Sequence, residues 1–407
     1  MTKPPVRIPI TNVYDGNDYT ARIKIGSQGR VANVILDTGS STLAVTPSAY
    51  DPIHDTHLKP TSLAQLIQYG SGGWAGPVVK TSLRMGIDEH EIALQRAPVA
   101  IIDIQQHGSF TGVDGILGLA YNVLNNAYDL AGYFSRHHIS PSVTYPWSFP
   151  AHSFKKFLVQ FGGLVHKQNI PIIPIEPYFD EIEKRGLLAN KFAFYTLRSW
   201  VHISDRVATD RLNQGYFIMG GGEEQHDLYT GSFTEVKVLH DVYYNTHLRT
   251  VQVGEGRIVQ AKELPAHLAP YQISNSIIDS GTSYLALASD VYHAISDSLD
   301  ALNPAFSHLI HQSQQKGSVA MGDLNLGTWP DLRFRFEGIH KDALLTVTPD
   351  TYWQVNYPAP GRAVFQVGPE GAQSIFGLPL LNNYYTVFDR SAGQTGVIKF
   401  ASIKRQV

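Results

Sequence analysis

The stretch Ile35-Leu36-Asp37-Thr38-Gly39-Ser40-Ser41 decides the fold, and a near copy of it, Ile277-Ile278-Asp279-Ser280-Gly281-Thr282-Ser283, returns in the second half of the chain. Each copy places an aspartate directly after two apolar residues and directly before a hydroxyl residue and a glycine. The apolar pair is typical of the end of a buried strand, and the hydroxyls can hydrogen-bond a carboxylate. Because burying an unpaired polar group costs about 2–7 kcal/mol, two such carboxylates indicate a function.

Either copy alone is compatible with an ordinary turn, since Asp, Ser, Thr and Gly all favour turns. A second shared pattern favours duplication instead. Ile116-Leu117-Gly118 follows the first copy, and Ile375-Phe376-Gly377 follows the second at a comparable distance. The sequence therefore predicts that a whole lobe is duplicated, because a short solenoid repeat would recur at much smaller spacing.

The composition predicts a globular, turn-rich, mostly β protein. The chain has 407 residues, enough for two lobes, with 43% apolar residues, 16% charged residues and 35 glycines. A formal net charge of −3 provides no basic field for nucleic acid or an anionic membrane. We therefore expect no nucleic-acid partner and, with no run of eighteen apolar residues, no membrane partner.

Two absent features bear on the origin of the chain. It has no cysteine, so it offers neither a disulfide nor a thiolate nucleophile, and it has no Asn-x-Ser/Thr glycosylation site. Together they favour a bacterial protein. No signal-peptide pattern is visible, and the compartment stays open, with a periplasmic or secreted location favoured.

Alternating apolar residues predict the strands that carry the motifs. A hairpin from Tyr19 to Leu36, turning at Gly26, delivers Asp37 to the end of its second strand. Residues 63–85 predict a second hairpin, with Tyr69 before a glycine-rich tip. This hairpin is either a mobile lid or an ordinary flexible hairpin.

The rest of the chain is expected to contain few helices. Residues 250–258 and 332–336 alternate as strands, and Ser289 or Asp290 is expected to cap a helix that ends near Leu302. Residues between Tyr121 and Pro177 are rich in aromatic residues, His and Pro. They predict an insertion that packs against the first lobe or, as the alternative, forms a partner surface.

The motifs together resemble the pepsin family of aspartic proteases over nearly the whole chain. Those that carry the resemblance are, in order, Asp37-Thr38-Gly39-Ser40-Ser41, Tyr69-Gly70-Ser71-Gly72, Val113-Asp114-Gly115-Ile116-Leu117-Gly118-Leu119-Ala120-Tyr121, Leu228-Tyr229-Thr230-Gly231, Asp279-Ser280-Gly281-Thr282-Ser283 and Tyr384-Tyr385-Thr386-Val387-Phe388-Asp389-Arg390. Ala44-Val45 and Trp74 are more similar to the beta-secretase branch than to gastric pepsin.

The resemblance implies an all-β, bilobal, pepsin-like acid protease fold, with two pseudo-twofold-related, β-barrel-like lobes and a central cleft. Residues 1–200 would form the N-terminal lobe with Asp37 and the flap, and residues 201–407 the C-terminal lobe with Asp279. It also implies an aspartic endopeptidase in which Asp37 and Asp279 are catalytic. Two nearby carboxylates share one proton, so the pair holds an acid and a base at once.

Further roles follow from the resemblance, residue by residue. Thr38 and Ser280 would lock the two active-site loops together, and Ser40 and Thr282 would hydrogen-bond the carboxylates, with Thr282 favouring an acidic optimum. The residues that would contact substrate are Gly39, Gly281, Tyr69, Gly70, Ser71, Ile35, Val113 and Ile116. The last three are apolar, which predicts cleavage beside Leu, Phe or similar residues in extended segments.

The chain departs from gastric pepsin at Ala44, where pepsin has a tryptophan that binds the flap tyrosine. Trp74, five residues after Tyr69 on the same hairpin, is the hypothetical replacement; otherwise it only packs the hairpin. We expect no metal or organic cofactor, sensitivity to pepstatin-type inhibitors, and a monomer that acts on peptides or unfolded proteins.

Two other functions compete with that of a protease. A catalytically silent, pepsin-fold binding module would typically have lost an aspartate or broken its motif, and both motifs are intact here. A carboxylate metal site has no supporting cluster in the sequence, because the pair His137-His138 lies in the insertion and is expected to be solvated.

Overall fold

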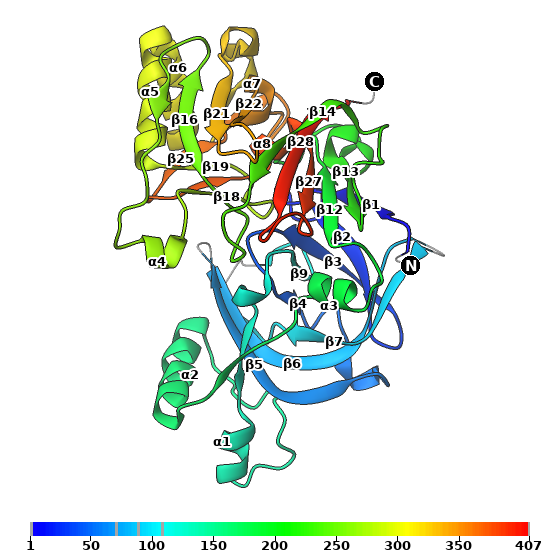
Figure 1. Ribbon diagram of the computed structural model, residues 1–407. Coiled ribbons are helices and arrows are strands. Elements are labelled where there is room, and N and C mark those ends of the chain that lie inside the picture. The colour runs from blue at the N-terminus through cyan, green and yellow to red at the C-terminus, as the bar shows by residue number, and fades with distance from the viewer. Residues whose placement is uncertain (1–2, 70–71, 88–89, 107–109, 406–407) are drawn as a thin grey trace. The chain divides into compact units, whose positions relative to one another are not determined.

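The computed structural model describes residues 3–69, 72–87, 90–106 and 110–405, which form two compact units. The first unit comprises residues 20–187. The second comprises residues 3–19 together with residues 188–405. The first strand of the chain therefore belongs to the same unit as its C-terminal half (Figure 1).

The first unit is mostly β-structure. Its strands are β2 (Thr20–Ile25), β3 (Arg30–Asp37), β4 (Leu43–Val45), β5 (Lys59–Tyr69), β6 (Gly72–Met85), β7 (Ile92–Ile101), β8 (Ile104–Gln105), β9 (Gly115–Gly118), β10 (Asn126–Asp129) and β11 (Ile172–Pro174). Its α-helices are α1 (Ala131–Arg136), α2 (Phe154–Gln168) and α3 (Tyr178–Lys184).

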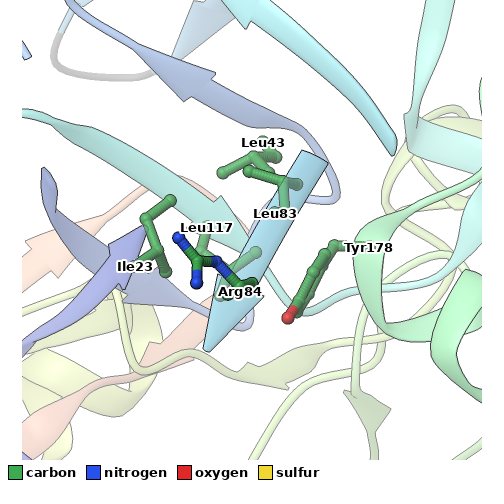
Figure 2. A pocket seen from close by; sticks show the side chains of 6 residues that line it. All are labelled: Ile23, Leu43, Leu83, Arg84, Leu117 and Tyr178. Atoms are coloured by element: carbon green, nitrogen blue, oxygen red, sulfur yellow. The ribbon is translucent and has the colours of Figure 1, made fainter. Parts of the chain in front are cut away.

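A closed barrel lies at the centre of this unit. Strand β2 pairs with β3, which pairs with β9, β9 with β4, β4 with β7 and β7 with β6, and β6 returns to β2. The inward residues are apolar, as alternating strands require. A narrow gap between Leu43, Leu117 and Tyr178 is too small for a water molecule (Figure 2). Tyr178 belongs to α3, so the barrel strands pack tightly against this helix.

The insertion adds both helices and strands to the first unit. Strand β10 pairs with β5, with Tyr128 opposite Ala64, and β11 pairs with β10. Helices α1 and α2 lie beside the β5–β6 hairpin (Figure 1), and their apolar side chains share one buried cluster with it. The predicted packing of this insertion against the first part of the chain is confirmed.

The second unit contains the remaining strands and helices. Its strands are β1 (Val6–Thr11), β12 (Lys191–Tyr195), β13 (Gln214–Met219), β14 (Tyr229–Lys237), β15 (Asn245–Thr246), β16 (Leu248–Val253), β17 (Val259–Gln260), β18 (Ser276–Ile278), β19 (Leu285–Ala288), β20 (Val319–Ala320), β21 (Leu332–Phe336), β22 (Ala343–Val347), β23 (Trp353–Val355), β24 (Arg362–Phe365), β25 (Val367–Glu370), β26 (Ser374–Phe376), β27 (Tyr384–Asp389) and β28 (Val397–Ile403). Its α-helices are α4 (Ala269–Gln272), α5 (Ser289–Leu302), α6 (Pro304–Lys316), α7 (Pro349–Tyr352) and α8 (Leu378–Leu381).

Several sheets organise this unit. An antiparallel sheet runs in the order β1, β13, β12, β27, β28, β14. A mixed sheet runs in the order β15, β18, β26, β19, β25, and an antiparallel sheet in the order β17, β16, β21, β22. Together with the barrel of the first unit, these sheets agree with the predicted all-β class of a pepsin-like protein.

Two local predictions in this unit are wrong. The strand expected over residues 250–258 ends at Val253, because the chain turns at Gly254, whose amide donates to the Asp331 carbonyl at 2.8 Å. The helix α5 has Ala288 at its N-cap and no side-chain cap. Ser289 Oγ donates to the Gly371 carbonyl at 3.2 Å, and Asp290 Oδ2 accepts from the Lys262 amide at 3.0 Å, so both side chains bind neighbouring loops instead.

Among the helices of the described ranges, none combines the length and the apolar character that crossing a membrane requires.

Candidate active site

Asp37 ends strand β3 in the first unit and is 7% exposed. Its Oδ1 accepts a hydrogen bond from the Gly39 amide at 2.7 Å, and its Oδ2 accepts one from Ser40 Oγ. The Leu119 amide, beyond the end of β9, donates to the Asp37 carbonyl at 2.7 Å. The carboxylate is therefore held at the end of a buried parallel strand pair by donors from its own loop.

Asp279 directly follows strand β18 in the second unit and is 8% exposed. Its Oδ1 accepts a hydrogen bond from the Gly281 amide at 2.9 Å, and its Oδ2 accepts one from Thr282 Oγ1 at 2.7 Å. Each oxygen thus has the same type of donor as in the first unit, from the glycine two residues on and the hydroxyl three residues on.

The strands around the two aspartates repeat in type and register. In the first unit, β3 runs parallel to β9, which pairs antiparallel with β4. In the second unit, β18 runs parallel to β26, which pairs antiparallel with β19. Ala44 lies opposite Ile116, and Ala286 lies opposite Ile375. The repeated sequence motif therefore corresponds to a repeated structural unit, in which the aspartate loop is surrounded by the same arrangement of three strands.

A glycine in each unit allows the aspartate loop to pass close to the neighbouring strand. A Cβ on Gly118 would lie 2.5 Å from the backbone nitrogens of Ser41 and Thr42. A Cβ on Gly377 would lie 2.0 Å from the Thr282 carbonyl oxygen. Only glycine fits at either position, which explains why both copies of the apolar pair end in this residue.

We call β5 and β6 the flap hairpin. Trp74 Nε1 donates to the Tyr69 hydroxyl at 3.3 Å, and Trp74 is fully buried. Burial raises the pKa of Tyr69 above its usual range, and the nearby Asp37 carboxylate raises it further, against the hydrogen bonds with Trp74 and Ser40. Tyr69 is therefore a neutral hydroxyl at any ordinary pH, close to the Asp37 loop.

The structure places the other predicted residues as follows. Thr38 and Ser280, next to the aspartates, are buried, and Gly39 and Gly281 supply the amides already described. The apolar residues Ile35, Val113 and Ile116 belong to one buried cluster, together with Ala44 and Trp74, against which Tyr69 packs. Gly70 and Ser71 lie outside the described residues.

Sequence reasoning missed a buried polar network behind the Asp37 loop. Thr42 Oγ1 donates to Asn125 Oδ1 at 3.1 Å, and Gln65 Nε2 donates to the same oxygen at 2.9 Å. Gln65 lies on β5 and is 1% exposed, so the network connects the loop to the flap hairpin. The position of Gln65 between the apolar residues Ala64 and Leu66 was the available signal, but its partners are distant in sequence.

No cluster of three or more His, Cys, Asp or Glu residues suited to a metal ion occurs in the part of the chain that the structure describes. His137 and His138 are exposed. His137 Nδ1 is hydrogen-bonded to the Tyr133 carbonyl at 2.9 Å.

Comparison with known proteins identifies the family. The family model for eukaryotic aspartyl proteases matches residues 18–137 and 165–401. The chain is 22% identical to a vacuolar protease A of Neurospora crassa, over 96% of this chain and 80% of that protein. It is also 22% identical to the vacuolar protease A of Arthroderma otae and to that of Aspergillus fumigatus, in each case over 94% of this chain and 78% of the relative. With both aspartate loops in place, the chain belongs to the aspartyl protease family of pepsin-like aspartic endopeptidases.

Proposed function

We propose that this endopeptidase hydrolyses peptide bonds with a water molecule activated between Asp37 and Asp279. The observation that supports it best is the identical support of the two carboxylates, each buried and each bound by one backbone amide and one hydroxyl. Such support stabilises the ionised form of a carboxylate without neutralising it. In this proposal, Asp37 belongs to an N-terminal lobe of residues 1–200 and Asp279 to a C-terminal lobe of residues 201–407.

The proposed reaction uses the two carboxyl groups as a base and an acid. The ionised aspartate takes a proton from water, whose oxygen attacks the amide carbon, and the protonated aspartate gives its proton to the carbonyl oxygen. A tetrahedral diol results. When it collapses, the C–N bond breaks, one hydroxyl returns its proton to a carboxylate, and the leaving nitrogen takes up a proton. Neither a covalent enzyme intermediate nor a metal is needed.

The pH dependence follows from the sharing of one proton. Both carboxylates cannot ionise easily when they lie within a few Å of each other, so the active singly protonated pair persists over an acidic range. Ser40 Oγ and Thr282 Oγ1 donate to the two carboxylates, and in this proposal Thr282 favours an acidic optimum. In this proposal, Thr38 and Ser280 hold the two loops in register.

The substrate preference follows from the apolar cluster beside the Asp37 loop. Ile35, Val113 and Ile116 would offer an apolar surface to a side chain next to the scissile bond. An extended peptide would hydrogen-bond to the backbone of Gly39, Gly281, Gly70 and Ser71, as an added strand does. Tyr69, held by Trp74, would close over the bond.

The alternative is a silent pepsin-fold binding module, which keeps the fold but does not cut. The intact donors at both aspartates favour the enzyme. The bacterial origin, the pepstatin sensitivity and the monomeric state stay predictions from the sequence.

The test is digestion of a mixed peptide library between about pH 3 and 7, with and without pepstatin. We expect acidic, pepstatin-sensitive cleavage beside Leu and Phe. Asp37→Asn and Asp279→Asn should each reduce kcat by at least about 10³-fold, because each removes the base or the acid. Asp300→Asn, which changes an exposed aspartate on α5, should leave the activity intact. Folded wild-type protein that cuts nothing at any pH would favour the binding module.

A further inference from the structure

The flap hairpin has two covered faces. Residues of one face, including Ile67, Tyr69 and Trp74, pack in the apolar cluster beside the Asp37 loop. Residues of the other face, including Leu66 and Ala75, pack in a second apolar cluster. Successive side chains of a strand point to opposite sides, so the second cluster lies on the face of the hairpin away from the first cluster. A hairpin that stood free in solvent would not need apolar residues there.

The insertion supplies the cover of this outer face. We call four of its ring-bearing residues the inserted aromatic cluster, namely Trp147, Phe149, Phe157 and Phe161. Phe157 and Phe161 stack with their ring centroids 5.0 Å apart, and Phe149 meets Phe161 edge-on at 5.6 Å. Because the rings also pack against one another, the cluster forms a stiff surface behind the hairpin.

Phe154, the first residue of α2, contacts the flap hairpin at Gly73. A Cβ on Gly73 would lie 2.7 Å from Phe154 Cζ, so the ring rests directly on the Gly73 backbone. Gly73 pairs with Gln68, and the next pair toward the tip is Tyr69 with Gly72. The Phe154 ring is buried. The outer cover thus reaches to within one residue pair of Tyr69.

The cluster lies in the part of the chain that the family model does not match, residues 138–164. Helix α2, which carries Phe154, begins there and runs to Gln168 (Figure 1). The contact with Gly73 is therefore an addition by this chain to a hairpin that the family model does match.

We propose that helix α2, which the inserted aromatic cluster holds against the first unit, positions the flap hairpin, with Phe154 as the positioning residue that acts on Tyr69 and Trp74 through Gly73. This inference rests on the proposed function, since it assigns the flap hairpin to the substrate site. A movement of the hairpin at the Gln68–Gly73 pair must then displace the Phe154 ring or move α2 with it.

The test compares Phe154→Ala with Val159→Ala by hydrogen exchange and kinetics. Val159 lies on the same helix and is 73% exposed, so its change should have no effect. Phe154→Ala should speed amide exchange in residues 65–69 and 72–80 about tenfold and reduce kcat/KM about tenfold, mainly through KM, because the flap holds substrate less well. Unchanged exchange in folded Phe154→Ala would overturn the proposal.

A second pair of variants guards against simple unfolding of α2. Hydrogen exchange across α2 shows whether Phe154→Ala unfolds this helix. If it does, Phe154→Leu is tested instead, and we expect it to speed exchange in the flap hairpin about threefold. Unchanged exchange in Phe154→Leu would overturn the proposal. The double variant Gly73→Ala/Phe154→Ala should lose less kcat/KM than the sum of the two single losses. The methyl group added at Gly73 no longer clashes with the Phe154 ring once that ring is removed. Additive effects would contradict the contact. The exchange measurements need no catalysis, so they remain decisive even if the wild type cuts nothing.

Discussion

Asp55 shows how strongly a single buried carboxylate can be held in this protein. It is 8% exposed, and its Oδ1 accepts from the Ser27 amide at 2.8 Å and the His57 amide at 2.9 Å. Its Oδ2 accepts from the hydroxyls of Tyr50 and Thr81. Burial alone would raise its pKa, but these hydrogen bonds outweigh it and lower the pKa of Asp55 from 3.8 to about 2.

This lowered pKa predicts how the stability depends on pH. A carboxylate whose pKa is lower in the folded state stabilises the fold above its unfolded pKa, and that contribution is lost as pH falls through the folded value. Asp55→Asn should therefore lower the free energy of unfolding by about 2 kcal/mol at pH 7. The difference from wild type should shrink between about pH 4 and pH 2.

Urea denaturation at several pH values measures this difference, in an Asp37→Asn background to prevent self-digestion. Asp297→Asn, at an exposed position of α5, is the control and should change little at any pH. A difference that stayed constant down to about pH 2 would mean that the substitution at Asp55 disrupts packing and that the ionised carboxylate contributes nothing.

At the residue scale, the sequence predicts what lies within a few positions of the motifs. The resemblance to the beta-secretase branch predicts Trp74, five residues after Tyr69 on the same hairpin, as the partner of Tyr69, and the structure has this hydrogen bond. Asn125 and Gln65 could not be predicted, since their contacts form only when β10, β5 and the Asp37 loop come together. The same reason explains the missed capping of α5, where Asp290 binds the distant Lys262 amide.

At the scale of elements, the loop between three strands is the unit that each half repeats. The closest backbone contact in this unit is at the glycine that follows the apolar pair, Gly118 or Gly377, where the aspartate loop passes directly over the glycine. The sequence predicts this element well, because a parallel strand pair has apolar residues on both faces and both copies share that run. The closure of the barrel by β6 and β2 requires long-range pairing that no local pattern shows.

Gly118→Ala should therefore destabilise the first unit by about 3 kcal/mol or more, because the new methyl would lie 2.5 Å from two backbone nitrogens. Gly162→Ala is the matched control in the same unit. Gly162 lies within α2, is exposed and has open space around a Cβ, so alanine should stabilise the helix by about 0.5–1 kcal/mol. Thermal unfolding measures both changes. Equal effects would show that the glycine acts through chain flexibility and not through close approach.

At the scale of the whole molecule, the two compact units do not follow the order of the chain. Strand β1 pairs with β13 from Val6 opposite Met219 to Thr11 opposite Gln214. Asn12 is fully buried, and its side chain donates to the Ser199 carbonyl at 3.2 Å. The alternating pattern of residues 6–11 indicates a strand, but nothing in the sequence indicates that its partner lies about two hundred residues away.

A chain that begins at Thr20 should consequently have a weakened second unit. We expect amides of β13 to exchange at least about tenfold faster, because they lose a neighbouring strand and the apolar residues Val6, Ile8 and Ile10. A synthetic peptide of residues 3–19, added in excess, should restore protection, while a scrambled peptide of the same composition should not. Full protection of β13 without any peptide would contradict this assignment.

The placement of β1 also imposes an order on biosynthesis. The strand leaves the ribosome well before its partner β13, which is completed only after residue 219 has been made. At about 5–20 residues per second, the wait is on the order of 10–40 s. The first unit can fold in that interval. The apolar side chains of β1 stay exposed, because the second unit in which they are buried has not yet been made. The speed of translation between residues 20 and 213 therefore sets how long the nascent chain carries a strand that is open to the wrong partner.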